Sequence, residues 1–261
     1  MSCNELQFVG PNPGRWLQDS LTVLDGRVGC VVPDRYPAYA RVLHRIDPDD
    51  RAIRWSDVCA ATGAVAHPLM QWHMISRGWT EHTGPDPLQG RGSDDPQEGN
   101  LDRISMTALY AILTQATAVG QGFHAFWTGW GGLRPGSVSI IEFGGDGHAR
   151  TPPDSAFPFP PEIVGGPTLD LPGREYLVFS GALEPRLFAD RPGSVFWPQS
   201  PNLSWPEDHS WCVATEIDFD STLVAGTADL IEAVLAHPAL EAWPVTADDR
   251  LTFDADVING P

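Results

Sequence analysis

Three carboxylates near the carboxyl end of the chain are spaced so that their side chains could act together. Glu216, Asp218 and Asp220 stand at every second position and follow an apolar, β-favouring run that begins at Cys212. Alternate side chains of a strand point to the same face, so a strand here would place the three on one acidic face. Neighbouring carboxylates repel one another unless water solvates them, arginine pairs with them or a cation binds. The sequence leaves these alternatives open. Solvation is the commonest of them, and a metal or cationic-ligand site is the most specific hypothesis.

The same stretch also resembles a phosphatase motif. Residues 218–222 read Asp-Phe-Asp-Ser-Thr, which is similar to the D-x-D-x-T motif of haloacid-dehalogenase-type phosphatases, where one aspartate is the nucleophile and the next the acid/base. In that family the motif lies on the first strand of a Rossmann-like domain, and a lysine or arginine and a further acidic pair follow much later. Here the sequence has no Lys, and Arg250 is the only arginine after Thr222. A short motif needs its structural context, so we do not expect a phosphatase.

Tryptophan is unusually frequent, with 10 in 261 residues, and several stand beside Gly or Pro. Packing in the core or under loops is the ordinary role of such side chains. The functional alternative is a partly exposed aromatic cluster beside Glu207, Asp208 and Glu216, which suits a cationic ligand or the centre of a protein interface. The candidate binding residues are Trp127, Trp130, Trp197, Trp205, Asp208, His209, Trp211, Glu216, Asp218 and Asp220.

Familiar cofactor and nucleophile motifs are missing from the sequence. His67 and His73 are separated by five residues, a spacing that is not typical of zinc sites. There is no Walker A motif, no G-x-G-x-x-G after a strand and no G-x-S-x-G. We therefore expect no cofactor and no metal, and the sequence identifies no catalytic residue. The four cysteines are widely spaced and are predicted to be reduced thiols: Cys3, Cys30, Cys59 and Cys212.

The formal net charge is −18, and all 16 basic residues are arginine. A surface this acidic repels nucleic acid and anionic lipid and favours a cationic protein partner or a small cationic ligand. The amino terminus lacks the basic and apolar regions of a signal peptide, so a cytoplasmic location is expected. Residues 104–133 carry no charge, but their Gln, His and Gly content favours a buried helix and strand over a membrane span.

The order of predicted elements indicates a single α+β domain over residues 1–261, with a largely antiparallel sheet. Two helices are predicted, over 105–119 with Ser105 as the cap and over 227–238 with Thr227 as the cap. Residues 39–46 fit either a strand or a helix. Other strands are expected at 27–33, 122–130, 137–143, 174–183, 210–217 and 240–245, and long Pro-rich loops at 80–100, 144–173 and 184–208.

One block of the sequence resembles a known group of proteins. Residues 200–226, SPNLSWPEDHSWCVATEIDFDSTLVAG, together with FHAFWTGWG and REYLVFSGAL upstream, resemble a family of uncharacterised proteins from high-GC Gram-positive bacteria, the actinobacteria. The resemblance extends over most of the chain, from residue 32 to residue 245. It implies a cytosolic, single-domain protein, and it implies no activity and no catalytic residue.

Two functions of different classes follow from these observations. The first is a cytosolic binding protein whose acidic, Trp-rich surface, residues 197–220, engages a cationic protein; a neutralising, immunity-type protein against a basic toxin is one concrete form. The second is a small-molecule or metal-dependent enzyme with an acidic site around residues 205–220. In that case Asp208, His209, Glu216, Asp218 and Asp220 would supply acid/base groups or metal ligands.

Overall fold

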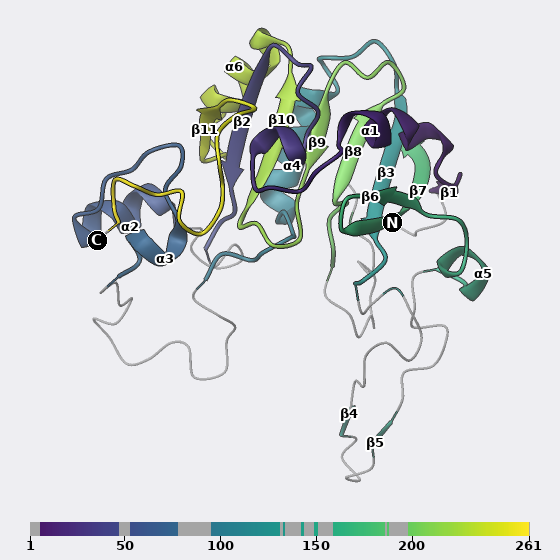
Figure 1. The fold of residues 1–261 in the computed structure, drawn as a ribbon, viewed down its shortest axis with the longest axis horizontal. Coiled ribbons are helices and arrows are strands. Elements are labelled where there is room, and N and C mark those ends of the chain that lie inside the picture. Colours follow the sequence, from purple (N-terminus) through teal and green to yellow (C-terminus); the bar gives the residue numbers. More distant parts are fainter. Residues whose placement is uncertain are drawn as a thin grey trace.

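The molecule is built mainly from β-strands, with short helices on both sides of them (Figure 1). A computed structural model describes residues 6–46, 53–77, 95–130, 133, 142–143, 149–150, 159–185, 187 and 198–260. The strands are β1 (Gln7–Phe8), β2 (Ala38–Leu43), β3 (Gln121–Trp127), β4 (Glu142–Phe143), β5 (Ala149–Arg150), β6 (Leu169–Leu171), β7 (Arg174–Ala182), β8 (Leu203–Pro206), β9 (Cys212–Ala214), β10 (Ser221–Gly226) and β11 (Ala242–Val245). The helices are α1 (Arg15–Ser20), α2 (Trp55–Thr62), α3 (Trp72–Ile75), α4 (Arg103–Leu113), α5 (Pro161–Val164) and α6 (Ala228–Ala236), with 3₁₀-helices η2 (Asn12–Gly14) and η3 (Val28–Cys30).

Nine of these strands form one sheet, in the order β1-β7-β3-β8-β9-β10-β2-β11, with β6 paired to β7. Neighbouring strands in this sheet are antiparallel. Strands β4 and β5 pair separately. Because strands from both ends of the chain share one sheet, the predicted single-domain α+β fold with a largely antiparallel sheet is confirmed.

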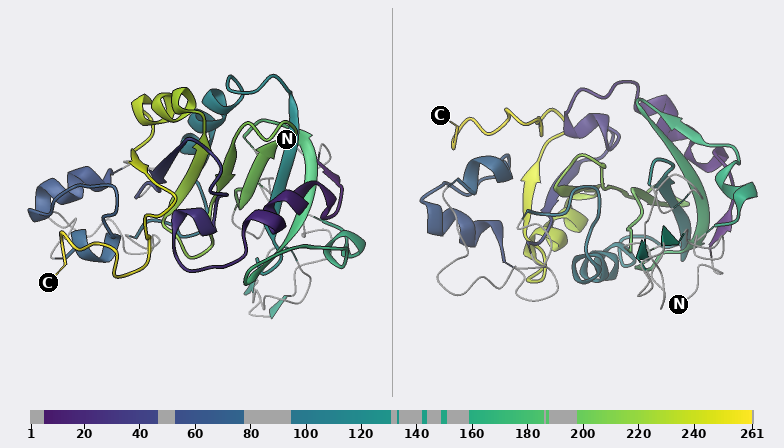
Figure 2. Two further views of the ribbon diagram at one scale, coloured as in Figure 1. Left: turned by 45° about the horizontal axis from the view of Figure 1, so that its top comes forward. Right: turned by 90° about the horizontal axis from the view of Figure 1, so that it is seen from below.

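Apolar side chains cover both faces of the sheet. Along β10, Leu223 and Ala225 pack with Leu17 of α1, whereas Val224 packs on the opposite side with Leu109 of α4 and Val234 of α6. In Figure 1, α1 accordingly lies in front of the sheet and α4 behind it. In both views of Figure 2, α2 and α3 lie beyond β11, at the end of the sheet away from β1. The central strands are therefore buried on both faces.

The two predicted helices are present, and their caps decide where they begin. Thr227 caps α6 as predicted, because its Oγ1 accepts a hydrogen bond from the Leu230 amide. The cap of α4 is Asp102 rather than Ser105: the Asp102 carboxylate accepts bonds from the amides of Ile104 and Ser105. This helix ends at Leu113, earlier than the predicted residue 119. A carboxylate is a strong acceptor at a helix amino terminus, which explains the earlier start.

The structure corrects several strand and loop predictions. Residues 27–33 contain η3 instead of a strand, and residues 39–46 contain β2, which resolves that ambiguity in favour of a strand. Within the predicted loop 184–208, residues 203–206 form β8, a strand between β3 and β9. The predicted loop 144–173 includes β5, α5 and β6, although residues 144–148 and 151–158 lie outside the described residues, as do residues 80–94 and 137–141 of the other predictions.

The uncharged stretch 104–133 forms α4 followed by β3, as the sequence predicted. Both elements bury apolar side chains, among them Leu109 and Phe126. No helix within the described ranges has the length and apolar content that crossing a membrane requires.

Candidate functional site

The D-x-D-x-T sequence begins in the turn of a β-hairpin, with Asp218 to Asp220, and ends in strand β10, with Ser221 and Thr222. β9 ends at Ala214, and β10 begins at Ser221 and pairs with β9 antiparallel, with Leu223 opposite Ala214. The prediction of one continuous strand face from residue 212 to residue 220 is therefore wrong. Asp218 stands in the turn with 73% of its side chain exposed, while the Glu216 side chain is buried. A hairpin in an antiparallel sheet also differs from the Rossmann-like context of the phosphatase motif.

Arg174, the first residue of β7, pairs with two of the three carboxylates. Its Nη2 atom lies 2.6 Å from Oε1 of Glu216 and 2.6 Å from Oδ2 of Asp218, and its Nε lies 3.0 Å from the same Glu216 oxygen. Burial lowers the pKa of Arg174, but the bonds to Glu216 and the charge of Asp218 outweigh it and raise the pKa above its ordinary value. One guanidinium thus serves two carboxylates.

The third carboxylate, Asp220, pairs with a buried arginine. Arg41 lies on β2, the strand between β10 and the edge strand β11, with 1% of its side chain exposed, and its Nη2 is 3.1 Å from Asp220 Oδ1. The same guanidinium donates to Ser221 and to the carbonyls of Pro68 and Met70. Among the alternatives that the sequence left open for these carboxylates, the structure therefore shows pairing with arginine.

A strap of residues 95–101 passes along the hairpin turn and adds two more acidic residues. The Gly99 amide donates to the Phe219 carbonyl at 2.9 Å. A Cβ at Gly99 would come within 2.8 Å of the Ile217 backbone, and Gly99 has a φ of +67°, so a side chain would both collide and be strained there. Glu98 and Asp95 are exposed on this strap.

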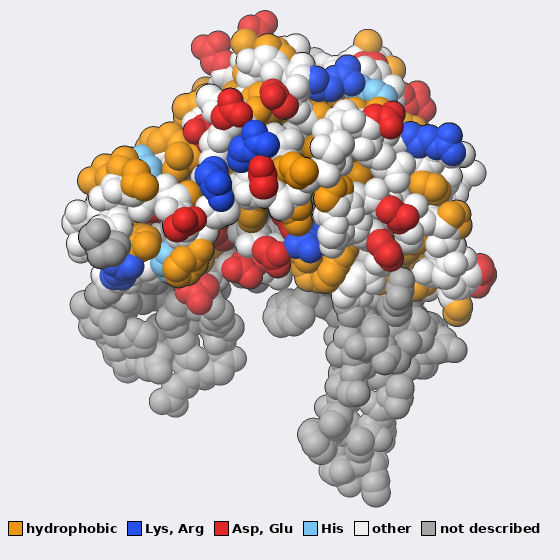
Figure 3. Space-filling model, in the orientation of Figure 1, with side chains coloured by type: hydrophobic (Ala, Val, Ile, Leu, Met, Phe, Trp, Pro, Cys, Tyr) orange, Lys and Arg blue, Asp and Glu red, His pale blue; other side chains and the backbone are white. Residues whose placement is uncertain are grey.

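We call Asp95, Glu98, Asp218 and Asp220 together the acidic edge. Burial and the nearby charges of Asp220, Asp218 and Asp95 all raise the pKa of Glu98, which shows that these groups repel one another. In Figure 3, several acidic side chains lie along the lower border of the coloured part, and others are scattered over the rest of this face. Arg174 and Arg41 offset only part of this charge.

Asn202 organises the neighbouring aromatic side chains. Its Oδ1 accepts bonds from the Trp127 amide and from Trp130 Nε1, both at 2.9 Å, and its Nδ2 donates to the Thr215 carbonyl. The two indole rings meet edge to face, with centroids 5.5 Å apart. Trp127 and Trp130 are half-buried. The structure therefore brings both of these predicted residues to the end of the sheet that carries Glu216 and Asp218.

The remaining predicted residues do not join this site. Trp205 and Trp211 are fully buried on opposite faces of the sheet, so the prediction that they belong to an exposed aromatic cluster is wrong. Asp208 and His209 lie in the connection between β8 and β9, at the far end of these strands from the β9–β10 turn. The extended strands thus separate residues that are close in sequence. Trp197 lies outside the described residues.

Asp208 and His209 have structural partners of their own. Thr117 donates to Asp208 at 2.6 Å and the Ser210 amide donates at 3.0 Å; these bonds outweigh the effect of burial and lower the pKa of Asp208. The His209 ring stacks on Trp16 with centroids 4.4 Å apart, and its backbone has a φ of +52°. Burial and the charge of Arg35 lower the pKa of His209.

A buried Ser–His pair has the contacts of a nucleophile and its base. Ser204 Oγ lies 3.1 Å from His124 Nδ1, and His124 Nε2 lies 3.1 Å from the Ala182 carbonyl, which fixes the proton on Nε2 when the ring is neutral. Tyr110 donates to the Ser204 hydroxyl at 2.8 Å. Both Ser204 and His124 are inaccessible to solvent. The pair therefore satisfies polar groups inside the fold and meets no substrate in this conformation.

Within the described ranges, no three His, Cys, Asp or Glu side chains are arranged to hold a metal ion. Comparison with protein-family models, with curated proteins and with solved structures gave no match. The interpretation of the site therefore depends on its own geometry, and the resemblance to the actinobacterial family stays a prediction.

His44 lies behind the acidic edge, and its burial predicts a stability that depends on pH. Its Nδ1 donates to the Gln97 carbonyl at 2.6 Å, and its Nε2 lies 2.9 Å from the Thr222 hydroxyl. Burial lowers the pKa of His44 more than the bond to Gln97 raises it. The unfolded chain therefore takes up a proton more readily than the folded chain, so stability is full above pH ~6.5 and falls below it.

We expect the melting temperature to fall as the pH is lowered from about 7.5 to about 5.5, across the ordinary pKa of histidine. His44→Gln should reduce this dependence, and His209, whose pKa burial also lowers, should account for part of what is left. Thermal unfolding followed by circular dichroism measures both. An unchanged slope in His44→Gln would show that another group is responsible.

Proposed function

We propose that this protein is a cytoplasmic binding protein that engages a cationic protein partner through the acidic edge. The observation that carries the proposal is the exposed turn of the β9–β10 hairpin. This turn presents Asp218, with 73% of its side chain exposed, beside the exposed Glu98 and Asp95. The pairing of β9 with β10 and the bond between Gly99 and Phe219 hold the hairpin and the strap together before a partner arrives, which lowers the cost of binding.

The charge of the whole chain supports the same function. A net charge of −18 attracts basic proteins over several ångströms and steers their approach, while it repels nucleic acid. Such complementarity raises association rates more than it raises affinity. A neutralising protein that must reach a basic toxin quickly is therefore one concrete form of the proposal.

The test removes charge from the edge without removing volume. The edge variant carries Asp95→Asn, Glu98→Gln and Asp218→Asn; the first of these keeps a side-chain oxygen that can accept the bond now donated by Trp72 Nε1. The control variant carries Asp19→Asn, Glu207→Gln and Glu232→Gln, which are exposed acids elsewhere on the molecule. Both variants lose the same formal charge, so any difference between them reports the position of the charge.

Tagged wild type and both variants are used to capture proteins from the source cells at low and at physiological salt. We expect one basic protein to be retained by wild type and control and lost from the edge variant. With that protein purified, its association rate should fall roughly tenfold for the edge variant. Equal capture by both variants would place the interface elsewhere, and an empty capture with wild type at low salt would contradict the proposal.

A further inference from the structure

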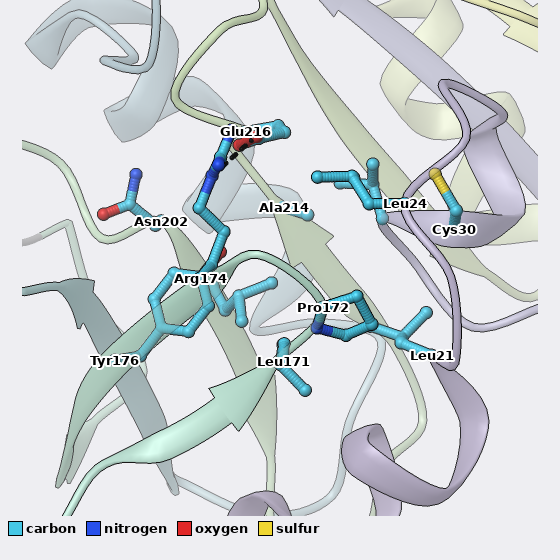
Figure 4. A pocket seen from close by; sticks show the side chains of 12 residues that line it. Leu21, Leu24, Cys30, Leu171, Pro172, Arg174, Tyr176, Asn202, Ala214 and Glu216 are labelled. Carbon is cyan, nitrogen blue, oxygen red and sulfur yellow. Dashed lines mark hydrogen bonds and ion pairs between the residues drawn. The ribbon is translucent and has the colours of Figure 1, made fainter.

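A small apolar pocket opens beside the acidic edge, between the segment after α1 and the β6–β7 turn (Figure 4). Its volume is ≈ 20 Å³, close to the space of one water molecule or one methyl group. Leu21 and Leu24 come from one side, Leu171 and Pro172 from another, and Ala214 forms part of the sheet behind them. Leu24 is 42% exposed, so the wall of the pocket reaches the surface.

A charged pair borders this pocket and connects it to the edge. Arg174 and Glu216 both line the pocket, and the dashed line in Figure 4 marks the ion pair between them. The guanidinium of Arg174 also bonds Asp218, whose Oδ2 faces it while most of the side chain stays in solvent. The apolar wall of the pocket and the exposed carboxylate of Asp218 therefore lie on either side of the Arg174 side chain, within contact of it.

We propose that this pocket receives a small aliphatic side chain of the cationic partner while an adjacent arginine or lysine of the same segment pairs with Asp218. The proposal rests on the proposed function and adds the chemistry that would select one basic protein among many. Charge alone attracts any basic surface, whereas a pocket beside the charge discriminates by shape. A pocket of ≈ 20 Å³ admits about one methyl group, and a valine side chain can supply it.

Two short peptides of equal charge test the proposal. They are Ac-Gly-Arg-Val-Arg-Gly-amide and Ac-Gly-Arg-Thr-Arg-Gly-amide. Threonine has nearly the shape of valine, but a hydroxyl group replaces one of the two methyl groups. Burying the hydroxyl without a partner is unfavourable, so we expect the valine peptide to bind about fivefold more tightly at low salt. Isothermal titration calorimetry measures both dissociation constants, and NMR should show contacts between the valine methyls and Leu24.

Variants of two neighbouring exposed residues provide the control. Leu24→Ser removes part of the pocket wall, whereas Val23→Ser changes a residue of similar exposure that does not line the pocket. The preference for valine should disappear in Leu24→Ser and persist in Val23→Ser, and Asp218→Asn should weaken both peptides alike.

Three results would contradict the proposal that the pocket receives an aliphatic side chain of the partner. They are equal binding of the two peptides, a valine preference that survives Leu24→Ser, and no binding of either peptide at millimolar concentration. None of these results changes the interpretation of the capture experiment, because that experiment depends on charge alone. If the acidic edge captures a basic partner but the two peptides bind equally, the proposed function is supported and only the proposal for the pocket is wrong.

Discussion

Replacement of Arg41 by methionine is expected to lower the free energy of unfolding by about 3–5 kcal/mol, the usual cost of breaking a buried ion pair from one side. Arg41 is 1% exposed, and its partner Asp220 is 20% exposed. Methionine fills similar space but leaves Asp220 without its cation and the carbonyls of Pro68 and Met70 without their donor. Urea denaturation followed by circular dichroism measures the change.

Three further variants separate the causes of this loss. Arg27→Met breaks an exposed arginine–aspartate contact and should have little effect, because solvent already screens that pair. Adding Asp220→Asn to Arg41→Met removes the unpaired charge and should recover part of the stability. Arg41→Lys keeps the charge but not the several donors of the guanidinium, so it should fall between wild type and Arg41→Met. If Arg41→Met is as stable as Arg27→Met, the buried pair does not hold the hairpin to β2.

The regular elements with strong local signals could be predicted from the sequence. The strands β3, β7 and β11 and the helix α6 each lie within their predicted ranges, apart from the first residue of β3. In α6 the local signals agree, since Thr227 caps the first turn and Leu230, Ile231 and Val234 form one buried face. When the cap and the apolar periodicity agree, a helix can be predicted from the sequence without tertiary information.

The elements that depend on their neighbours could not be predicted. Residues 203–206 follow Pro201 and end at Pro206, in a segment that looks like a loop, yet β3 and β9 supply hydrogen-bonding partners on both sides. The strand β9 ends at Ala214 because the chain turns back into β10, and Ile217 and Asp218 at this turn are not the Gly and Asn residues that announce a hairpin. Tertiary pairing overrides local preference in both places.

The candidate site was only partly visible for the same reason. The sequence showed that Glu216, Asp218 and Asp220 are close together, but their partners Arg174 and Arg41 are distant in sequence, 179 residues away in the case of Arg41 and Asp220. The strap contributes Asp95 and Glu98, and nothing local indicates that Gly99 bonds to Phe219. The frequent tryptophans misdirected the prediction, because a tryptophan beside proline looks the same whether it is exposed or buried.

The buried tryptophans give the second large effect. Trp205→Ala and Trp211→Ala are each expected to lower the free energy of unfolding by about 3–5 kcal/mol, because each removes a large side chain that is fully buried. Loss of partner binding in either variant would therefore report unfolding and would not locate an interface. Urea denaturation of both variants, beside the charge variants of the edge, measures this cost. Alanine variants with wild-type stability would contradict the burial of these side chains.

Phenylalanine at the same positions isolates one hydrogen bond. Trp211 Nε1 donates to the Leu113 carbonyl at 3.1 Å, whereas Trp205 Nε1 has no hydrogen-bond partner among the described residues. Both substitutions remove the same atoms from fully buried sites, so the loss of packing is matched to first order. Trp211→Phe should cost about 1 kcal/mol more than Trp205→Phe, the usual net contribution of one hydrogen bond. Only Trp211→Phe removes a side-chain bond, and the Leu113 carbonyl then keeps the Ala116 amide as its remaining donor. Equal costs would mean that the bond contributes nothing and that packing alone keeps Trp211 between α4 and the sheet.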